Sequence, residues 1–162
     1  MSPEAFEAAI IEQISAQNLS AIAYPENPKN YYPENETGDV LVRYEGRKVL
    51  GRDLGNGQNK VKLFAEVVVV SRELRGPDGA YAWLQQIYKA LEGYTLSGSA
   101  GPLNMEAESF MDENNGIWQY GQKWSMVTFE FIDCPVDEAA EVLYVWTEPV
   151  NKFPYRFPFN LS

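Results

Sequence analysis

The chain has 162 residues, of which 45% are hydrophobic and 14% aromatic, and this length and apolar content are typical of one globular domain with its own core. Its 13 basic and 23 acidic residues give a formal charge of -10, which argues against a nucleic-acid-binding surface because affinity for phosphates comes mainly from Lys and Arg. With no histidine and one cysteine, Cys134, the sequence excludes an internal disulfide and every catalytic pair that needs histidine.

The N-terminal segment predicts an amphipathic helix that starts at a Ser2 cap and runs to about Gln17. Its apolar residues recur four apart, at Phe6, Ile10 and Ile14. The acidic start lacks the positive patch and apolar stretch of a signal peptide, and no run approaches the ~18 apolar residues of a membrane helix. We therefore expect a protein that is made in a cytoplasm and has no contact with membranes.

A short strand is expected at Leu19–Ala23, and after it comes the segment Tyr24–Asn35, in which Tyr-Pro-Glu-Asn occurs twice. Its prolines exclude it from a helix interior or a central strand, and its asparagines favour turns, so we expect a stiff surface loop. After Gly38, alternating apolar residues predict a strand at Asp39–Gly46. The glycine-rich stretch Gly51–Lys60 predicts a mobile loop or hairpin tip.

The stretch Val61–Leu74 has the strongest strand pattern in the chain, since its four consecutive valines indicate burial on both faces of a central strand. A second helix is expected to begin at Ala80 and stop near Gly93. Its predicted buried face is made of Ala80, Leu84, Ile87, Tyr88 and Leu91.

Two further strands, Leu103–Asp112 and Gly116–Ile132, are predicted to form a hairpin, because the Asn-Gly pair between them tolerates positive φ. The apolar residues of the second strand change parity, which predicts a bulge near residues 123–128. The elements together predict an α+β fold over residues 1–134, a mainly antiparallel sheet with two helices packed on it. Residues 135–162 are expected to be an extended C-terminal arm, because Pro154 and Pro158 exclude a regular helix.

No constellation for catalysis or cofactor binding is recognisable. Cys134 is expected to be structural and to act as a small apolar side chain and not as a nucleophile, because nothing nearby lowers the pKa of its thiol. The glycines of Gly51–Gly57 lack the Lys-Ser/Thr ending of a phosphate loop, and the acidic turn Asp112–Gly116 lacks the ligand spacing of a calcium loop. Glu106 and Glu108 are expected to lie on one face of a strand, close enough for their pKa values to split. Two solvent-exposed carboxylates on an acidic surface explain the pattern equally well. We therefore expect no enzyme, no metal and no cofactor.

Three runs carry a resemblance to a known family. They are YPENPKNYYPENETGDVLVRYEGRKV, FAEVVVVSRELRGPDGAYAWLQQIYKALEGY and PLNMEAESFMDENNGIWQYGQKWSM. They contain a Pro-Glu-Asn-Pro element and three later motifs, which lie at Gly38, Leu41, Val42 and Tyr44, at Arg72, Leu74, Arg75 and Gly76, and at Gly116, Trp118 and Tyr120. The chain resembles, over residues 3 to 130, the Mu-like bacteriophage proteins named after that phage's gene-thirty-seven product. More loosely, it is similar to tail-terminator and minor tail proteins.

The resemblance implies a structural protein of the virion tail. Such proteins cap a tail tube or join it to the head connector, usually as a six-subunit ring, with tail-tube and head-completion proteins as partners. A ring needs two different adhesive surfaces on each subunit. We expect its subunit interface at Tyr24, Tyr31, Tyr32, Phe153, Tyr155, Phe157 and Phe159. DNA would pass without specific binding along an acidic lumen, for which the candidates are Glu106, Glu108, Asp112 and Glu113.

An alternative stays open from the residues alone. The same α+β core is compatible with a non-viral binding module, in which an aromatic groove recognises a peptide or small ligand. Its candidate residues are Trp83, Trp118, Trp124 and Trp146, although Trp at such positions is more often part of a core.

Overall fold

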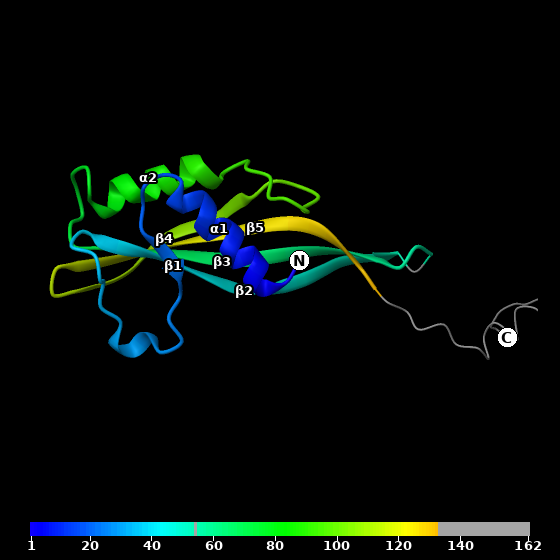
Figure 1. The fold of residues 1–162 in the computed structure, drawn as a ribbon, viewed down its shortest axis with the longest axis horizontal. Helices are drawn as coiled ribbons and strands as arrows, with labels where there is room; N and C mark the ends of the chain where they lie inside the picture. The colour runs from blue at the N-terminus through cyan, green and yellow to red at the C-terminus, as the bar shows by residue number, and fades with distance from the viewer. Residues whose placement is uncertain (54, 133–162) are drawn as a thin grey trace, which may run out of the picture. The chain divides into compact units, whose positions relative to one another are not determined.

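The computed structural model describes residues 1–53 and 55–132, and the contacts reported below lie within one compact unit, Met1–Phe131. This unit contains two α-helices and five strands (Figure 1). In chain order they are α1 (Pro3–Ser15), β1 (Ala21–Ala23), the 3-10 turn η1 (Pro28–Asn30), β2 (Gly38–Asp53), β3 (Gln58–Ser71), α2 (Ala80–Leu91), β4 (Asn104–Asn114) and β5 (Ile117–Phe131).

The strands form one five-stranded sheet in the order β1-β2-β3-β5-β4. β1 runs parallel to β2, and the other three neighbouring pairs are antiparallel. Both helices pack on the same side of this sheet, which we call the helix face, and the opposite side is the open face (Figure 1). The predicted α+β fold, two helices on a mainly antiparallel sheet, is confirmed. The predicted boundary at residue 134 stays a prediction, because the residues that follow it lie outside the described ranges.

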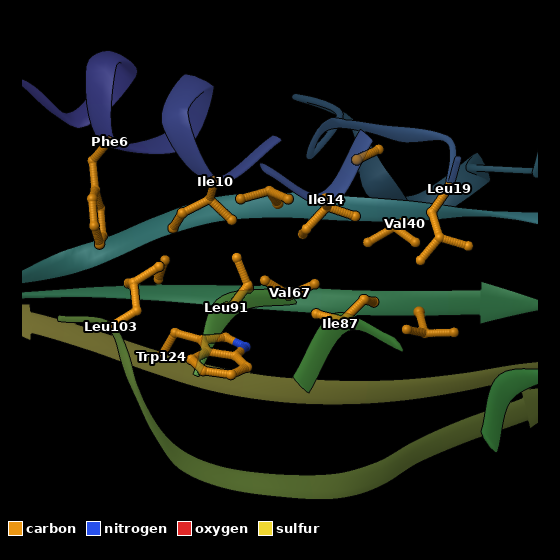
Figure 2. Close-up of a cluster of buried hydrophobic side chains, with 14 of the residues drawn as sticks. Phe6, Ile10, Ile14, Leu19, Val40, Val67, Ile87, Leu91, Leu103 and Trp124 are labelled. Atoms are coloured by element: carbon orange, nitrogen blue, oxygen red, sulfur yellow. The ribbon is translucent and has the colours of Figure 1, made fainter. Parts of the chain in front are cut away.

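α1 forms as its sequence predicts. Ser2 caps the helix, since its hydroxyl accepts a hydrogen bond of 3.1 Å from the Ala5 N–H. Phe6, Ile10 and Ile14 are fully buried, and Figure 2 shows them in a row pointing toward the sheet. The helix ends at Ser15, two residues before the predicted end.

The main core lies between the helices and the sheet. Figure 2 shows Ile87 and Leu91 of α2 close to Trp124 of β5, with Leu103 beside them. On α2 the prediction of Tyr88 as a core residue is wrong, because Tyr88 is 37% exposed, and Trp83 is buried in its place. β3 is the central strand, and its valines alternate as predicted between the two faces of the sheet: Val67 and Val69 join the main core, while Val68 and Val70 join a second cluster.

β2 extends well beyond the predicted strand, and β3 begins three residues before the predicted strand and ends three residues before its predicted end. The sequence predicts a loop at Gly51–Lys60, but β2 continues to Asp53 and β3 begins at Gln58. The hairpin projects past the helices (Figure 1), and its outer residues are solvated on both faces. Paired strands that are solvated on both faces do not require alternating apolar and polar residues. The sequence pattern therefore did not predict strands in this region. We call the hairpin Gly46–Lys62 the arm.

The bulge predicted near residues 123–128 is wrong. The β3·β5 register is unbroken from Gln58 opposite Phe131 to Ser71 opposite Trp118. The change of parity reflects two faces of one regular strand, because Trp124 faces the helices and Phe129 is exposed on the open face. Register shifts occur in β2 and β4 instead.

Candidate functional site

The loop Tyr24–Asn35 packs on the open face of the sheet, on the side away from α2 (Figure 1). Under it lies the second hydrophobic cluster, in which Tyr24 and Tyr31 pack against buried side chains of β2, β3 and β5. These are Leu41, Val68, Val70 and Ile117. The loop therefore shields these apolar residues of the open face from solvent.

A single buried carboxylate holds this loop. Asp39 is 1% exposed and stands next to Gly38 at the start of β2. It accepts hydrogen bonds from the Tyr31 hydroxyl (2.5 Å), the Glu34 N–H (2.9 Å), the Ser20 hydroxyl (3.1 Å) and the Asn35 side-chain amide. The second half of the loop is therefore fastened to the sheet by charge-assisted hydrogen bonds.

The same contacts set the ionisation of both groups. Burial alone would raise the pKa of Asp39, but the hydrogen bonds from Tyr31, Asn35, Glu34 and Ser20 outweigh it and hold that pKa below its usual value. Burial and the hydrogen bond to Asp39 raise the pKa of Tyr31 above its ordinary value. At neutral pH the pair is a phenol that donates to a carboxylate.

The three predicted interface tyrosines of the loop differ in their surroundings. Tyr24 is half-buried, with the Arg43 guanidinium 5.0 Å from its ring centroid, and Tyr31 is tied to Asp39. Tyr32 is 63% exposed, and the Arg72 guanidinium lies 5.7 Å from its ring. Tyr24 and Tyr31 therefore help to fold the loop, whereas Tyr32 presents most of its ring to the solvent.

A small cavity of about 100 Å³ opens between the loop and the sheet. Tyr31, Val70 and Gln119 are among its lining residues, and it extends to the β4–β5 turn at Asn115. Its volume is below the roughly 300 Å³ at which small-molecule sites usually begin. It has room for water or one short side chain.

The middle of the open face carries a network of ion pairs. Glu66 of β3 is 5% exposed and lies 3.2 Å from the Arg43 guanidinium and 3.4 Å from the Lys123 ammonium. Lys123 also contacts Glu45 at 2.9 Å. Burial and the neighbouring Glu45 carboxyl raise the pKa of Glu66. The hydrogen bond between Glu45 and Glu66 lowers the pKa of Glu45. Positive and negative charges alternate here, so this part of the face is not an acidic wall.

The four predicted lumen residues lie on β4, but they do not share a face. Glu106 accepts from the Ser125 hydroxyl (2.5 Å) and contacts the Lys62 ammonium (2.5 Å), both on the open face. Glu108 accepts from the Gln122 amide (2.8 Å) on the helix face. The expectation that Glu106 and Glu108 lie on one face is wrong, because a register shift between Met105 and Ala107 places an extra residue there.

Asp112 and Glu113 stand at the other end of β4, next to the turn. The Glu113 carboxylate accepts from the Gly116 N–H (2.8 Å), and the turn uses positive φ at Asn115 (53°) and Gly116 (80°), as the Asn-Gly pair predicts. All four carboxylates therefore lie along one strand at the edge of the sheet. Among the described residues, no three His, Cys, Asp or Glu side chains gather as a metal site would require.

Aromatic side chains gather beside β4 on the helix face. The Phe110 ring centroid lies 5.5 Å from that of Tyr120 and 6.4 Å from that of Trp118, and Tyr81 of α2 lies 5.8 Å from Tyr120. Phe110 is 54% exposed. The sequence pattern identified Trp118 and Tyr120 but missed Phe110, because its neighbours along the strand are polar and its exposure depends on the sheet edge.

A comparison with protein-family models shows the family to which the chain belongs. Residues 13–146 match the family model described as Gp37 protein. The chain belongs to the Gp37 family. Gp37 is a family of phage proteins, so the bacteriophage assignment is confirmed. A search of curated proteins found no match for this Gp37 chain.

The motif residues of this Gp37 chain meet at one end of the sheet. Arg72, which follows β3, donates from its side chain to the Pro33 carbonyl (3.2 Å) and from its N–H to the Thr37 carbonyl (3.1 Å). The Arg-Glu-Leu-Arg-Gly turn therefore clamps the proline-rich loop. Phe153, Tyr155, Phe157 and Phe159, predicted as interface residues, lie outside the described residues, as does Trp146. In the described part of the chain, no helix has the length and apolar character needed to cross a membrane.

Proposed function

We propose that this Gp37 chain is a structural component of the phage tail, a tail terminator or tail-completion protein that forms a ring at the end of the tail tube. The observation that carries the proposal is the family match over residues 13–146. The expected partners are further copies of the chain and the tail-tube and head-completion proteins.

The non-viral binding module receives little support. Trp83 and Trp124, two of its four candidate residues, are 4% and 0% exposed and belong to the main core. Trp118 is half-buried beside Phe110, and the cavity under the loop is small. An aromatic groove built from these tryptophans would require the core to open.

The proposal is tested first in the particle. Phage or prophage particles are purified, tails are separated from heads, and the protein is sought in each fraction by mass spectrometry. We expect it in the tail fraction, and we expect deletion of its gene to give tails of abnormal length or heads without tails. Normal particles that lack the protein would contradict the proposal.

The predicted role of the C-terminal aromatic residues has its own test. A chain without residues 150–162 is compared with the full chain by analytical ultracentrifugation over a range of concentrations. Weaker association of the shortened chain is expected, because apolar residues at an interface supply much of the association energy. Unchanged association would remove Phe153, Tyr155, Phe157 and Phe159 from the interface.

A channel wall that repels DNA is also a prediction, supported by the net charge of -10. Neutralising Asp112 and Glu113 together, as Asp112→Asn and Glu113→Gln, is expected to slow genome release and to increase retention of the protein on DNA at low salt. Equal retention of the variant and the parent protein on DNA would argue that these residues lie outside the channel.

A further inference from the structure

Two long strand edges have no strand partner among the described residues. β1 covers β2 only from Val40 to Val42, and the Glu7 carboxylate accepts the Tyr44 N–H (2.7 Å). The outer edge of β2 is therefore open from Glu45 to Asp53. On the other side of the sheet, β4 pairs with β5 alone. Each open edge presents a row of backbone donors and acceptors to which another strand can pair.

The two edges carry opposite charge. The outer edge of β2, residues 45–53, has three basic residues, Arg47, Lys48 and Arg52, and two acidic ones, Glu45 and Asp53; with Lys60 and Lys62 of β3, the arm Gly46–Lys62 as a whole has a net charge of +4 in a chain of net charge -10. β4 has four acidic residues, Glu106, Glu108, Asp112 and Glu113, and no basic one, which gives -4. Oppositely charged surfaces of this kind guide partners together and fix their register.

Both edges also expose apolar side chains. On β2, Val49 is 39% and Leu50 46% exposed. On β4, Phe110 is 54% and Met111 43% exposed. An exposed strand with large apolar residues is prone to associate unless a partner covers it. The two edges are therefore complementary in charge, and each exposes apolar side chains that a partner strand would bury.

We propose that β4 of one subunit pairs with the outer edge of β2, residues 45–53, of a second copy of this chain, so that the sheets of neighbouring subunits join edge to edge. The inference rests on the proposed ring function and identifies its subunit interface. Each edge is roughly 30 Å long, from a rise of about 3.3 Å per residue, so the two strands can pair over most of their length.

Strand direction agrees with a ring. From β2 to β3, from β3 to β5 and from β5 to β4 the direction reverses each time, so β4 runs opposite to β2 within one subunit. Rotation about a ring axis that lies along the strands preserves the direction of each strand in the next subunit. β4 and the neighbour's β2 therefore meet antiparallel, which is the more stable pairing.

Charge also argues against the symmetric alternatives. If β4 paired with β4 of a second copy, four carboxylates would face four carboxylates. If two arms paired with each other, basic residues would face basic residues, and Lys48 already stands opposite Lys62 within one arm. Like charges that face each other across an interface disfavour the wrong partner. The remaining combination, β4 with the arm, is head-to-tail and repeats until the ring closes.

In this arrangement the acidic residues of β4 have a different role from the predicted lumen. Glu106 is already paired with Lys62 of its own subunit, and Glu108 and Asp112 are exposed. The exposed carboxylates would contact Lys48 and Arg52 of the neighbour's arm, for which no ion pair occurs among the described residues. The network of acidic edge and basic arm would then be continuous around the ring.

Two charge-reversal variants test this interface. The edge variant carries Glu108→Lys and Asp112→Lys, and the arm variant carries Lys48→Glu and Arg52→Glu. Each is expected to weaken self-association at least about tenfold in sedimentation velocity, because like charges then face each other. A control with Glu12→Lys and Asp78→Lys has the same charge change as the edge variant at exposed positions away from both edges, and it is expected to associate like the parent protein.

The decisive measurement is an equimolar mixture of the two variants. The lysines of the edge variant then face the glutamates of the arm variant, and the wild-type edge faces the wild-type arm, so association is expected to return to the parent level. A restored mixture also shows that both variants are folded. The proposal is overturned if either variant alone associates like the parent, if the mixture stays dissociated, or if the parent protein is monomeric at every concentration.

The outcomes separate this interface from the proposed function. If the protein is found in tails but the mixture fails to associate, the tail assignment stands and the edge pairing is wrong. If the mixture assembles but the protein is absent from tails, the edge pairing stands and the tail function is wrong.

Discussion

The Tyr31 hydroxyl donates a hydrogen bond of 2.5 Å to the carboxylate of Asp39, a residue that is 1% exposed. This contact links the loop in which Tyr-Pro-Glu-Asn occurs twice to the first residues of β2. The loop thereby covers the second hydrophobic cluster on the open face. A proline-rich segment without helix or strand periodicity is thus a fixed part of the fold.

The first prediction concerns this hydrogen bond. Tyr31→Phe is expected to lower the free energy of unfolding by about 1.5–3 kcal/mol, because hydrogen bonds to charged groups contribute about that much and Asp39 stays buried. Chemical denaturation measures the loss. Tyr32→Phe is the matched control: the neighbouring ring is 63% exposed, and its substitution is expected to change stability by less than about 0.5 kcal/mol. Equal effects of the two substitutions would contradict the assigned role of Tyr31.

The second prediction uses pH. The folded protein holds the pKa of Asp39 below its unfolded value of about 3.9, so the stability that Asp39 supplies is present above that pH and is lost as the pH falls through the folded pKa. The pKa of Glu66 is raised above its unfolded value of about 4.3, so its contribution is present below that pH and is lost as the pH rises through the folded pKa.

Urea denaturation at a series of pH values separates these two contributions. The stability difference between parent protein and Asp39→Asn is expected to shrink as the pH falls below about 4. The difference between parent protein and Glu66→Gln is expected to shrink as the pH rises above about 4. Parallel pH profiles for the two variants would show that the two carboxyls do not titrate with opposite shifts.

The sequence was sufficient for most of the fold where burial controls the pattern. The fully buried row of Phe6, Ile10 and Ile14 on α1, the valines of β3 and the Asn115-Gly116 turn follow the predicted spacing. Solvated strands were not predictable in the same way. The outer half of β2, from Arg47 to Asp53, is exposed at every position and therefore has no apolar period.

The candidate site was predictable only where the local sequence determines it. The loop Tyr24–Asn35 is at the surface as its prolines predict, but Tyr31 is held by the buried carboxylate of Asp39, which no apolar period identifies. The face of each residue on β4 depends on two register shifts, which arise from pairing with β5. Unpaired edges are a property of strand order, so they became visible only with the sheet.

The third prediction concerns Gly38, where β2 begins. Its φ is +135°, and a Cβ at this position would overlap the Val70 carbonyl oxygen. Gly46 has nearly the same φ, +136°, but a Cβ there would meet no atom within 4 Å. Gly46→Ala is expected to cost only backbone strain, about 1–3 kcal/mol, and Gly38→Ala to cost clearly more or to prevent folding. Thermal unfolding of both variants measures the difference, and equal costs would mean that the contact with Val70 relaxes freely.

The fourth prediction separates folding from association within the loop. Tyr32→Ala is expected to change the free energy of unfolding by at most about 1 kcal/mol, because the exposed contact between its ring and Arg72 contributes no more than that. Tyr24→Ala removes a half-buried ring from the second cluster and is expected to cost about 2 kcal/mol or more.

If the loop contacts a neighbouring subunit through Tyr32, Tyr32→Ala also weakens self-association, since exposed aromatic residues are common anchors of interfaces. Denaturation curves and sedimentation velocity on the same samples give both quantities. A Tyr32→Ala protein with parent stability and parent association would assign the loop to the fold alone, and the edges of β2 and β4 would then have to account for ring contacts in the described part of the chain.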